Sequence, residues 1–174
     1  MPYALEVLIT SDQITAKIAD LSARISDDYR GQAVILVGIL KGSFIFLADL
    51  ARAISADVEI DFAQTSSYGP DRSSSGIVQI RKDLDINIEG KHVLIVEDII
   101  DSGTTLKHLR ELWSTRRPKT LRVCTLLLKP AALLVETPVE YVGFEIPNEF
   151  VVGYGLDHGE KYRNLPYIAI LRKG

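Results

Sequence analysis

The stretch from Lys91 to Thr105, KHVLIVEDIIDSGTT, constrains the fold of this chain more than any other. Val93–Val96 is an unbroken run of apolar residues, most of them branched, which is typical of a strand buried on both faces of a sheet. A turn rich in hydroxyl groups and glycine follows, and the leucines and tryptophan beyond it recur at helical spacing. The sequence therefore predicts a buried strand, a polar loop and a helix in direct succession.

Polar groups gather where this strand is predicted to end. Glu97 and Asp98 place two carboxylates after the apolar run, and the loop Asp101–Thr105 opens the following helix. In open α/β sheets, ligands bind beyond the carboxyl ends of the strands, and the amides of a helix N-terminus suit a phosphate group. Carboxylates suit the hydroxyl groups of a sugar, with or without a divalent cation. These residue types in this order predict a site for a phosphorylated sugar.

The rest of the chain continues the alternation of strands and helices. Residues 10–30 are expected to form an amphipathic helix, opened by a capping box between Thr10 and Gln13. The strand Ala33–Leu40 leads into a helix whose inner face is expected to carry Phe44, Leu47, Leu50, Ala51 and Ile54. Further strands are expected at 57–65, 77–81, 120–128, 139–144, 150–152 and 168–171. This order predicts an α/β fold, with a mostly parallel twisted sheet flanked by helices.

Composition narrows the class of protein. The 174 residues are 47% apolar and 25% charged, as in an ordinary globular domain. The net charge of −3 gives no broad basic surface, so we expect no nucleic-acid partner. The apolar runs are shorter than a membrane span, and the N-terminus lacks the features of a signal peptide. The single Cys124 cannot form an intrachain disulfide, which favours a reduced, cytoplasmic setting.

Two segments carry a family resemblance. VLIVEDIIDSGTT resembles the 5-phosphoribosyl-1-pyrophosphate (PRPP) binding motif of type I phosphoribosyltransferases, and its EDIIDSGTT form is similar to the branch that acts on 6-oxopurines. GFEIPNEFVVGYGLD and YRNLPY near the C-terminus are similar to the same branch. The resemblance extends from about Leu40 to Arg172. It implies a single domain over residues 1–174, with a core of about 30–150 and a small hood made of the N-terminal segment and about 150–174.

The resemblance also implies a reaction, in which a purine nitrogen displaces pyrophosphate from C1 of PRPP to give a nucleoside 5′-monophosphate. The substrates would be PRPP and hypoxanthine, with guanine as a further base, and Mg²⁺ would be the cofactor. Asp101 is expected to act as general base or acid at purine N7. The 5′-phosphate would bind Asp101, Ser102, Gly103, Thr104 and Thr105. Glu97 and Asp98 would bind the ribose hydroxyls and, with Asp157, the metal ion.

The remaining roles implied by the resemblance concern pyrophosphate, base and lid. Lys41, Gly42 and Arg163 would bind pyrophosphate, and the peptide bond before Lys41 is often cis in this family. Lys129 would contact the exocyclic O6 of the purine, which selects against adenine. The base site is completed by Phe150, which would stack on the ring, by the backbone of Val151, and by Asp157. Ser67 and Tyr68 match a Ser-Tyr pair that closes over the reaction.

Several alternatives remain open at the level of the sequence. The enzyme could prefer guanine or xanthine, because backbone carbonyls read the purine 2-position and leave no sequence trace. A second interpretation is a regulator that senses PRPP without turnover. Such regulators usually lose catalytic residues, whereas this chain retains Asp101, Lys129, Asp157 and Arg163. A P-loop enzyme is not supported, because G-x-x-x-x-G-K-[ST] does not occur. Homo-oligomerisation, as a dimer or tetramer, is expected from the family.

Overall fold

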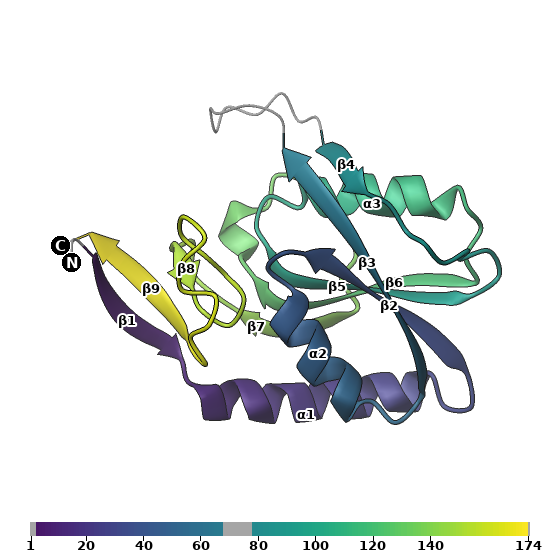
Figure 1. Ribbon diagram of the computed structural model, residues 1–174, viewed down its shortest axis with the longest axis horizontal. Helices are drawn as coiled ribbons and strands as arrows, with labels where there is room; N and C mark the ends of the chain where they lie inside the picture. Colours follow the sequence, from purple (N-terminus) through teal and green to yellow (C-terminus); the bar gives the residue numbers. More distant parts are fainter. Residues whose placement is uncertain (1–2, 68–77, 174) are drawn as a thin grey trace.

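The computed structural model describes residues 3–67 and 78–173. Its centre is a six-stranded sheet of order β4-β3-β2-β5-β6-β7 (Figure 1). The five parallel strands are β2 (Ala33–Leu40), β3 (Asp57–Ser67), β5 (His92–Ile100), β6 (Thr120–Leu128) and β7 (Tyr141–Glu145). The edge strand β4 (Val78–Lys82) pairs antiparallel with β3. The predicted α/β class with a mostly parallel sheet is confirmed.

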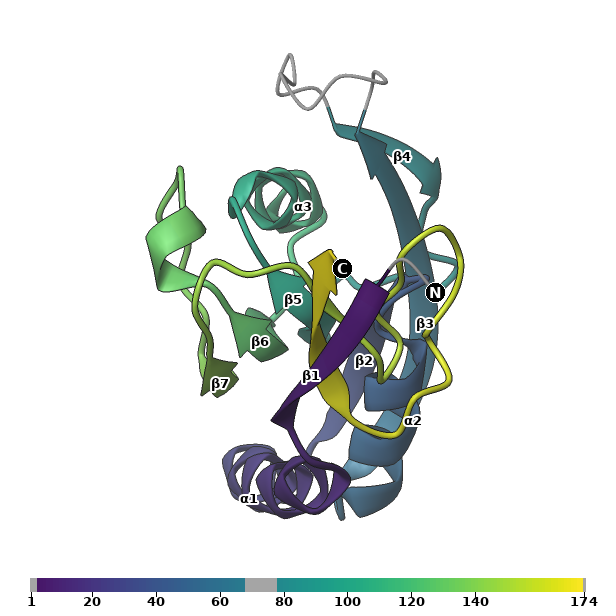
Figure 2. The ribbon, with the colours of Figure 1, turned by 90° about the vertical axis from the view of Figure 1, so that its left-hand side faces the viewer.

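Helices cover both faces of this sheet. α1 (Ser11–Asp28) and α2 (Phe44–Ala53) lie on one face, and α3 (Thr104–Ser114) lies on the other (Figure 2). A single 3₁₀ turn (Pro130–Ala132) follows β6. Because side chains alternate along a strand, each central strand contributes to two apolar cores. Leu94 and Val96 of β5 pack in the core under α1 and α2, whereas Val93 and Ile95 pack in the core under α3.

Local chemistry explains how the helices begin. The predicted capping box is confirmed, since Gln13 N donates to Thr10 Oγ1 at 3.2 Å and Thr10 N donates to Gln13 Oε1 at 2.8 Å. The expected inner face of α2 was wrong at its first residue. Phe44 is 44% exposed and Phe46 is fully buried. The helix begins at Phe44, and its buried stripe runs through Phe46, Leu47 and Leu50, so Phe44 projects from the first turn away from the core.

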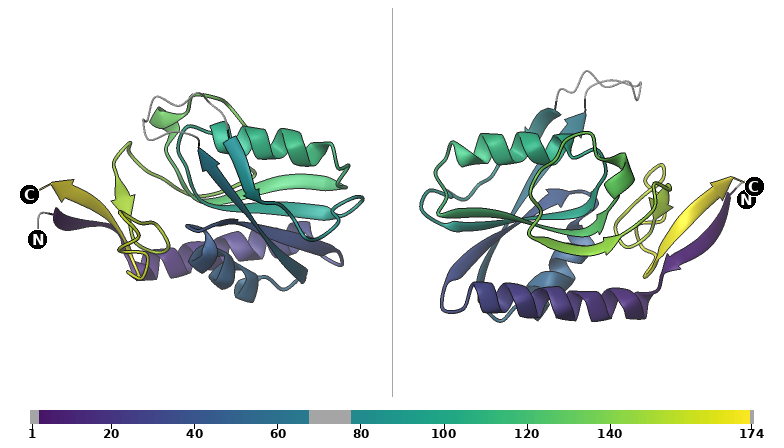
Figure 3. Two further views of the ribbon diagram at one scale, coloured as in Figure 1. Left: turned by 45° about the horizontal axis from the view of Figure 1, so that its top comes forward. Right: turned by 180° about the vertical axis from the view of Figure 1, so that it is seen from behind.

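A second sheet joins the two ends of the chain. Its order is β1-β9-β8, formed by β1 (Tyr3–Ile9), β9 (Ile168–Lys173) and β8 (Val151–Val152), and its pairings are antiparallel. This sheet stands at the side of the molecule away from β4 and α3, with both termini at its outer end (Figures 1 and 3). A strand over residues 3–9 was not predicted. The terminal segments therefore form one structure, and the proposed division into core and hood stays a prediction.

None of the described helices is both long enough and apolar enough to span a lipid bilayer.

Candidate active site

The site begins with the alternation of side chains at the carboxyl end of β5. The strand continues to Ile100, so Glu97 and Asp98 lie within it rather than after it. Consecutive residues of a strand point to opposite faces, and Glu97 follows the face of Ile95 while Asp98 follows that of Val96. Glu97 therefore lines a pocket on the α3 side and Asp98 lines a second pocket on the other side. The structure divides the acidic pair that the sequence presents as one unit.

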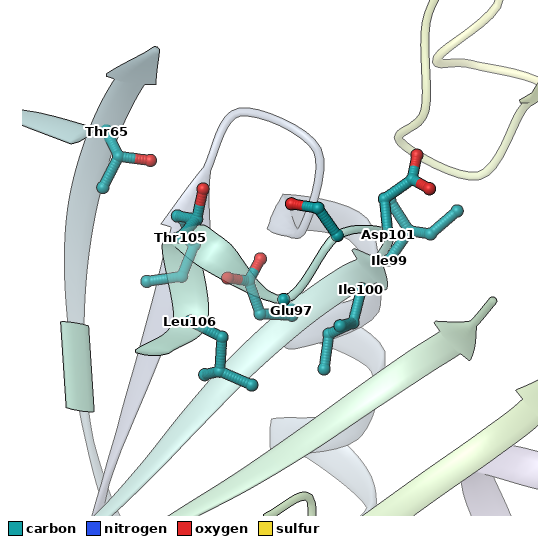
Figure 4. Close-up of a pocket in the computed structure, with 10 residues that line it drawn as sticks. Thr65, Glu97, Ile99, Ile100, Asp101, Thr105 and Leu106 are labelled. Carbon is teal, nitrogen blue, oxygen red and sulfur yellow. The ribbon is translucent and has the colours of Figure 1, made fainter. Parts of the chain in front are cut away.

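The first pocket is formed by the loop that leads into α3. Ser102, Gly103 and Thr105 line it, together with Asp101 and Glu97. In the view of Figure 4 the Glu97 side chain is seen between Thr105 and Asp101, and Thr65 stands farther out, beyond Thr105. Thr65 and Ile39 line the same pocket and were not predicted, because neither belongs to a recognisable motif.

Glycine is required at the turn into α3. Gly103 has a φ of +80°, and a Cβ there would lie 2.7 Å from the carbonyl oxygen of Val135. Thr104 begins the helix, and its amide donates to Ser102 Oγ at 3.3 Å. The amides of the first helical turn have no acceptor within the helix and carry its positive dipole end. The loop therefore offers hydroxyl and amide donors to an anion, as expected for a phosphate site.

The second pocket collects most of the remaining predicted site residues. It lies next to the first, and the two share Ile99 and Asp101. Its lining comes from the carboxyl ends of β2, β5 and β6 and from the segment that follows β7, and comprises Lys41, Gly42, Asp98, Ile99, Asp101, Lys129, Phe150, Val151, Leu156, Asp157 and Arg163. Parts of the chain as far apart as Lys41 and Arg163 thus meet at one edge of the sheet.

Lys129 is the cation placed deepest in this pocket. Its side chain is 7% exposed, and its Nζ lies 3.3 Å from Oδ2 of Asp101, whose side chain is 58% exposed. Removing a charge from water is costly unless it is paired, so Asp101 compensates the buried ammonium. The pair places an acceptor and a donor side by side between the two pockets.

Close backbone contacts hold the two loops that carry the other cations. The Leu40–Lys41 peptide is cis, which the sequence alone could not show. A Cβ at Gly42 would lie 1.8 Å from Asp98 Oδ2, and a Cβ at Gly155 would lie 2.1 Å from the carbonyl oxygen of Gly42. Both glycines are therefore required by packing, and they bring the segment after β8 into contact with the loop after β2.

Arg163 lies beside this contact in a fixed orientation. Its Nη1 donates to the carbonyl of Gly155 at 2.7 Å, and its Nη2 lies 3.0 Å from Asp157 Oδ1 and 3.3 Å from Glu160 Oε1. Glu160 also binds Lys41, with 3.0 Å between its Oε2 and Lys41 Nζ. Glu160 was not predicted as a site residue, and no motif marks it. It joins the two cations that the sequence assigned to pyrophosphate.

The two carboxyl groups of β5 are shifted toward their neutral forms. Burial, and then the charge of Asp98, raises the pKa of Glu97 well above its usual range. Burial also raises the pKa of Asp98 to about 6, although backbone hydrogen bonds and Arg163 act to lower it. Such shifts are common where a cleft is built to receive charged ligands.

The predicted metal ligands do not form one cluster. Among residues 3–67 and 78–173, no three His, Cys, Asp or Glu side chains lie close enough together to hold a metal ion. Asp98 and Asp157 share the second pocket, whereas Glu97 lies in the first. Two carboxylates beside a pocket fit Mg²⁺, which commonly takes one or two protein carboxylates and completes its shell with substrate oxygens. The structure therefore places two of the three expected metal ligands, Asp98 and Asp157, beside one pocket.

The aromatic side of the second pocket comes from Phe150. The residue is 43% exposed, and its ring meets that of His158 edge to face, with 5.5 Å between the ring centroids. Val151 is buried beside it in β8. Of the two expected lid residues, Ser67 ends β3 and Tyr68 lies outside the described residues.

Comparison with known proteins agrees with this geometry. The sequence matches the family described as the phosphoribosyl transferase domain over residues 10–158. The hypoxanthine phosphoribosyltransferase of Escherichia coli (strain K12) is 52% identical over 171 residues, covering 97% of this chain and 96% of that protein. The hypoxanthine-guanine phosphoribosyltransferase of Mycobacterium avium is 54% identical, covering 95% of this chain and 84% of that protein.

Solved structures show the same similarity in three dimensions. A hypoxanthine-guanine phosphoribosyltransferase from Bacillus anthracis matches with a TM-score of 0.91 at 50% identity, covering 95% of this chain and 97% of that chain. Family match, close relatives and fold agree over nearly the whole length. The chain belongs to the phosphoribosyltransferase family, in the branch of the hypoxanthine and hypoxanthine-guanine phosphoribosyltransferases.

Proposed function

We propose that this protein is a purine salvage enzyme that transfers the 5-phosphoribosyl group of PRPP to hypoxanthine, and also to guanine, with release of pyrophosphate. One observation carries the proposal. Asp101 lies where a pocket with a phosphate-type loop adjoins a pocket that holds cations and an exposed aromatic ring. A sugar phosphate, a pyrophosphate and a flat base have chemically matched partners within this pair of pockets.

PRPP is proposed to lie across the two pockets. Its 5′-phosphate binds the loop Asp101–Thr105, and its pyrophosphate binds beside Lys41, Gly42 and Arg163. The ribose lies between them, with Glu97 and Asp98 approaching from opposite faces of β5. A guanidinium whose orientation is already fixed suits a phosphate oxygen, and a lysine adds a mobile charge.

The purine is proposed to lie against Phe150, since an exposed aromatic face suits a flat base. The backbone of Val151 would contact its edge, and Lys129 would donate to O6. Adenine carries an amino group at that position, so two donors would face each other and both would stay unpaired. The buried position of Lys129 supports this selection, because it has little freedom to turn away.

The chemical step forms a bond from a purine nitrogen to C1 as the bond from C1 to the pyrophosphate oxygen breaks. Asp101 accepts the proton from purine N7 as the new bond forms, and returns it in the reverse reaction. Lys129 donates a hydrogen bond that holds the Asp101 carboxylate in place. Carboxylates beneath the ribose stabilise the positive charge that develops at C1. Asp98 and Asp157 would hold Mg²⁺, which, when bound, offsets the negative charge of pyrophosphate.

We also propose a homo-oligomer, a dimer or a tetramer, in a reduced cytoplasmic setting. The second point is supported by the single Cys124, which has no second cysteine to form an intrachain disulfide with. Cys124 is fully buried in β6, and burial raises the pKa of its thiol. A thiol in such surroundings is unreactive.

The test is an absorbance assay with PRPP and Mg²⁺, in which hypoxanthine, guanine, xanthine and adenine are offered separately. We expect turnover of hypoxanthine and guanine, none of adenine, and loss of activity without Mg²⁺. Asp101→Asn should lower kcat by roughly 10²- to 10⁴-fold, because it removes the proton acceptor and keeps the size of the side chain.

The same assay separates the alternatives. A dominant rate with guanine or xanthine would change the preferred base and keep the reaction. Binding of PRPP without turnover of any purine would refute the enzymatic proposal in favour of a PRPP-sensing regulator.

A further inference from the structure

Glu160 lies between the two cations assigned to pyrophosphate, and nothing in the assignment above gives it a role. We propose that Glu160 is a positioning residue that competes with pyrophosphate for Lys41 and Arg163, and so weakens pyrophosphate binding and speeds its release. This inference rests on the proposed function, because it takes the ligand of these two cations to be pyrophosphate.

The geometry of the carboxylate is that of a bridging anion. Its two oxygens take different partners, with Oε2 at 3.0 Å from Lys41 Nζ and Oε1 at 3.3 Å from Arg163 Nη2. Lys41 stands 119 residues earlier in the sequence, so this contact joins two separate loops. A phosphate group offers oxygens of the same charge type to the same two donors. Pyrophosphate and Glu160 therefore cannot both satisfy these donors fully.

The backbone of Glu160 is held so that the side chain points at the cations. Its φ is +65°, a conformation that L residues rarely adopt, and its amide donates to Asp157 Oδ2 at 2.8 Å. The hydrogen bond from Lys41 and the charge of Arg163 lower the pKa of the Glu160 carboxyl. The side chain itself is 64% exposed, so it can swing into solvent without disturbing the core.

Arg163 does not depend on Glu160 for its orientation. Its side chain is 19% exposed and is fixed by the carbonyl of Gly155 and by Asp157. Lys41 differs, because its side chain is 57% exposed and, in the described part of the chain, its ammonium pairs with Glu160. Loss of Glu160 should thus leave the guanidinium in place and free both cations for a ligand. This argues for competition rather than for support.

The expected effect is modest, because exposed ion pairs are weak. Glu160→Gln keeps the shape of the side chain and removes its charge. We expect inorganic pyrophosphate with Mg²⁺ to bind the variant roughly 3- to 10-fold more tightly than the wild type. The KM for PRPP should fall by a similar factor, and the KM for hypoxanthine should not change. This split is one that a purely structural role would not produce.

The experiment is calorimetric titration of pyrophosphate and Mg²⁺ into the wild type, Glu160→Gln and Glu160→Ala, with steady-state kinetics for each. Glu59→Gln is the matched control, because Glu59 is also exposed and pairs with Lys91 at 3.4 Å, outside both pockets. It should bind pyrophosphate like the wild type. Thermal unfolding of each variant checks that the fold is intact.

Tighter binding by both Glu160 variants supports the inference. Unchanged or weaker binding, with a wild type that binds pyrophosphate and turns over PRPP, overturns the inference alone. A wild type that neither binds pyrophosphate nor turns over PRPP overturns the proposed function together with the inference.

Discussion

Asp98 links the ionisation of the site to the stability of the protein. Burial raises the pKa of its carboxyl from an ordinary value near 3.8 to about 6. Between these values the folded protein binds more protons than the unfolded chain, so stability falls as pH rises through this window. Above pH 6 the Asp98 carboxylate is charged in the folded protein although it is buried, and this lowers the free energy of unfolding. A cation or a cationic partner in the pocket relieves this cost, which favours binding.

We predict that Asp98→Asn removes this dependence. In metal-free protein, the free energy of unfolding of the variant minus that of the wild type should increase from pH 4 to pH 7, by up to about 3 kcal/mol. The reason is that only the wild type must ionise a buried carboxyl over this range. Urea unfolding at each pH measures it. Asp20→Asn, on the exposed side of α1, is the control and should run parallel to the wild type. Parallel curves for Asp98→Asn would show that the carboxyl is not held neutral by the fold.

Structural elements meet at the site through backbone contacts, and one such contact joins Gly155, in the segment after β8, to Gly42, in the loop after β2. Gly155 has a φ of +100°, and its missing Cβ would lie 2.1 Å from the Gly42 carbonyl oxygen. Any side chain at this position must push the two loops apart. The distance between Lys41 and Arg163 depends on this contact, because Lys41 directly precedes Gly42 and Arg163 donates a hydrogen bond to the carbonyl of Gly155.

We predict that Gly155→Ala lowers kcat/KM for PRPP by at least about 10-fold, since misplacing binding groups by about 1 Å can cost about 10²-fold. Gly159→Ala is the matched control. Gly159 lies in the same segment at a φ of +58°, with nothing within 4 Å of an added Cβ. Equal losses in the two variants would assign the effect to backbone strain instead of the clash.

The existence and order of most strands and helices are predictable from apolar periodicity, because a buried strand and an amphipathic helix each leave a local pattern. β1 leaves none. Most of its side chains are exposed, and it is a strand because residues 3–9 pair with β9 at the far end of the chain. The wrong prediction for Phe44 has a local cause: the residue is apolar, but it lies in the first turn of α2 and projects away from the core.

The candidate site is predictable to a similar degree. The loop Asp101–Thr105 and Gly42 can be recognised in the sequence by residue type and spacing. The separation of Glu97 from Asp98 follows from the period of a strand, but only once the strand is known to extend through both. Glu160 is beyond sequence reasoning, because its role depends on Lys41 in a distant loop and an acid in a polar segment usually faces solvent.

At the scale of the whole molecule, Tyr154 joins the segment that follows β8 to the core. The phenol is buried and donates a hydrogen bond to Asp49 of α2, and burial raises its pKa. Tyr154 itself lies in the segment that follows β8, next to Gly155. This bond therefore connects the segment that carries Asp157 and Arg163 to a helix of the core.

We predict that Tyr154→Phe lowers the free energy of unfolding by about 1.5–3 kcal/mol, because the hydrogen bond from the buried phenol to the charged carboxylate of Asp49 is lost. Chemical denaturation measures it. Tyr167→Phe is the control, since no hydrogen bond of its hydroxyl occurs among the described residues, and it should cost less than about 0.5 kcal/mol. A loss no larger than that of the control would contradict the anchoring role.

The pairing of β1 with β9 has a consequence for how the chain can be connected. Tyr3 lies opposite Lys173, so the two ends of the polypeptide are neighbours (Figure 3). A short linker between them would leave every strand pairing as it is, and the chain could then be opened at the turn around Gly31, between α1 and β2. A circular permutant of this kind would present the same two pockets from a polypeptide that begins at β2. The site depends on how these segments are arranged in space, and the order of the segments along the chain can therefore be changed without altering it.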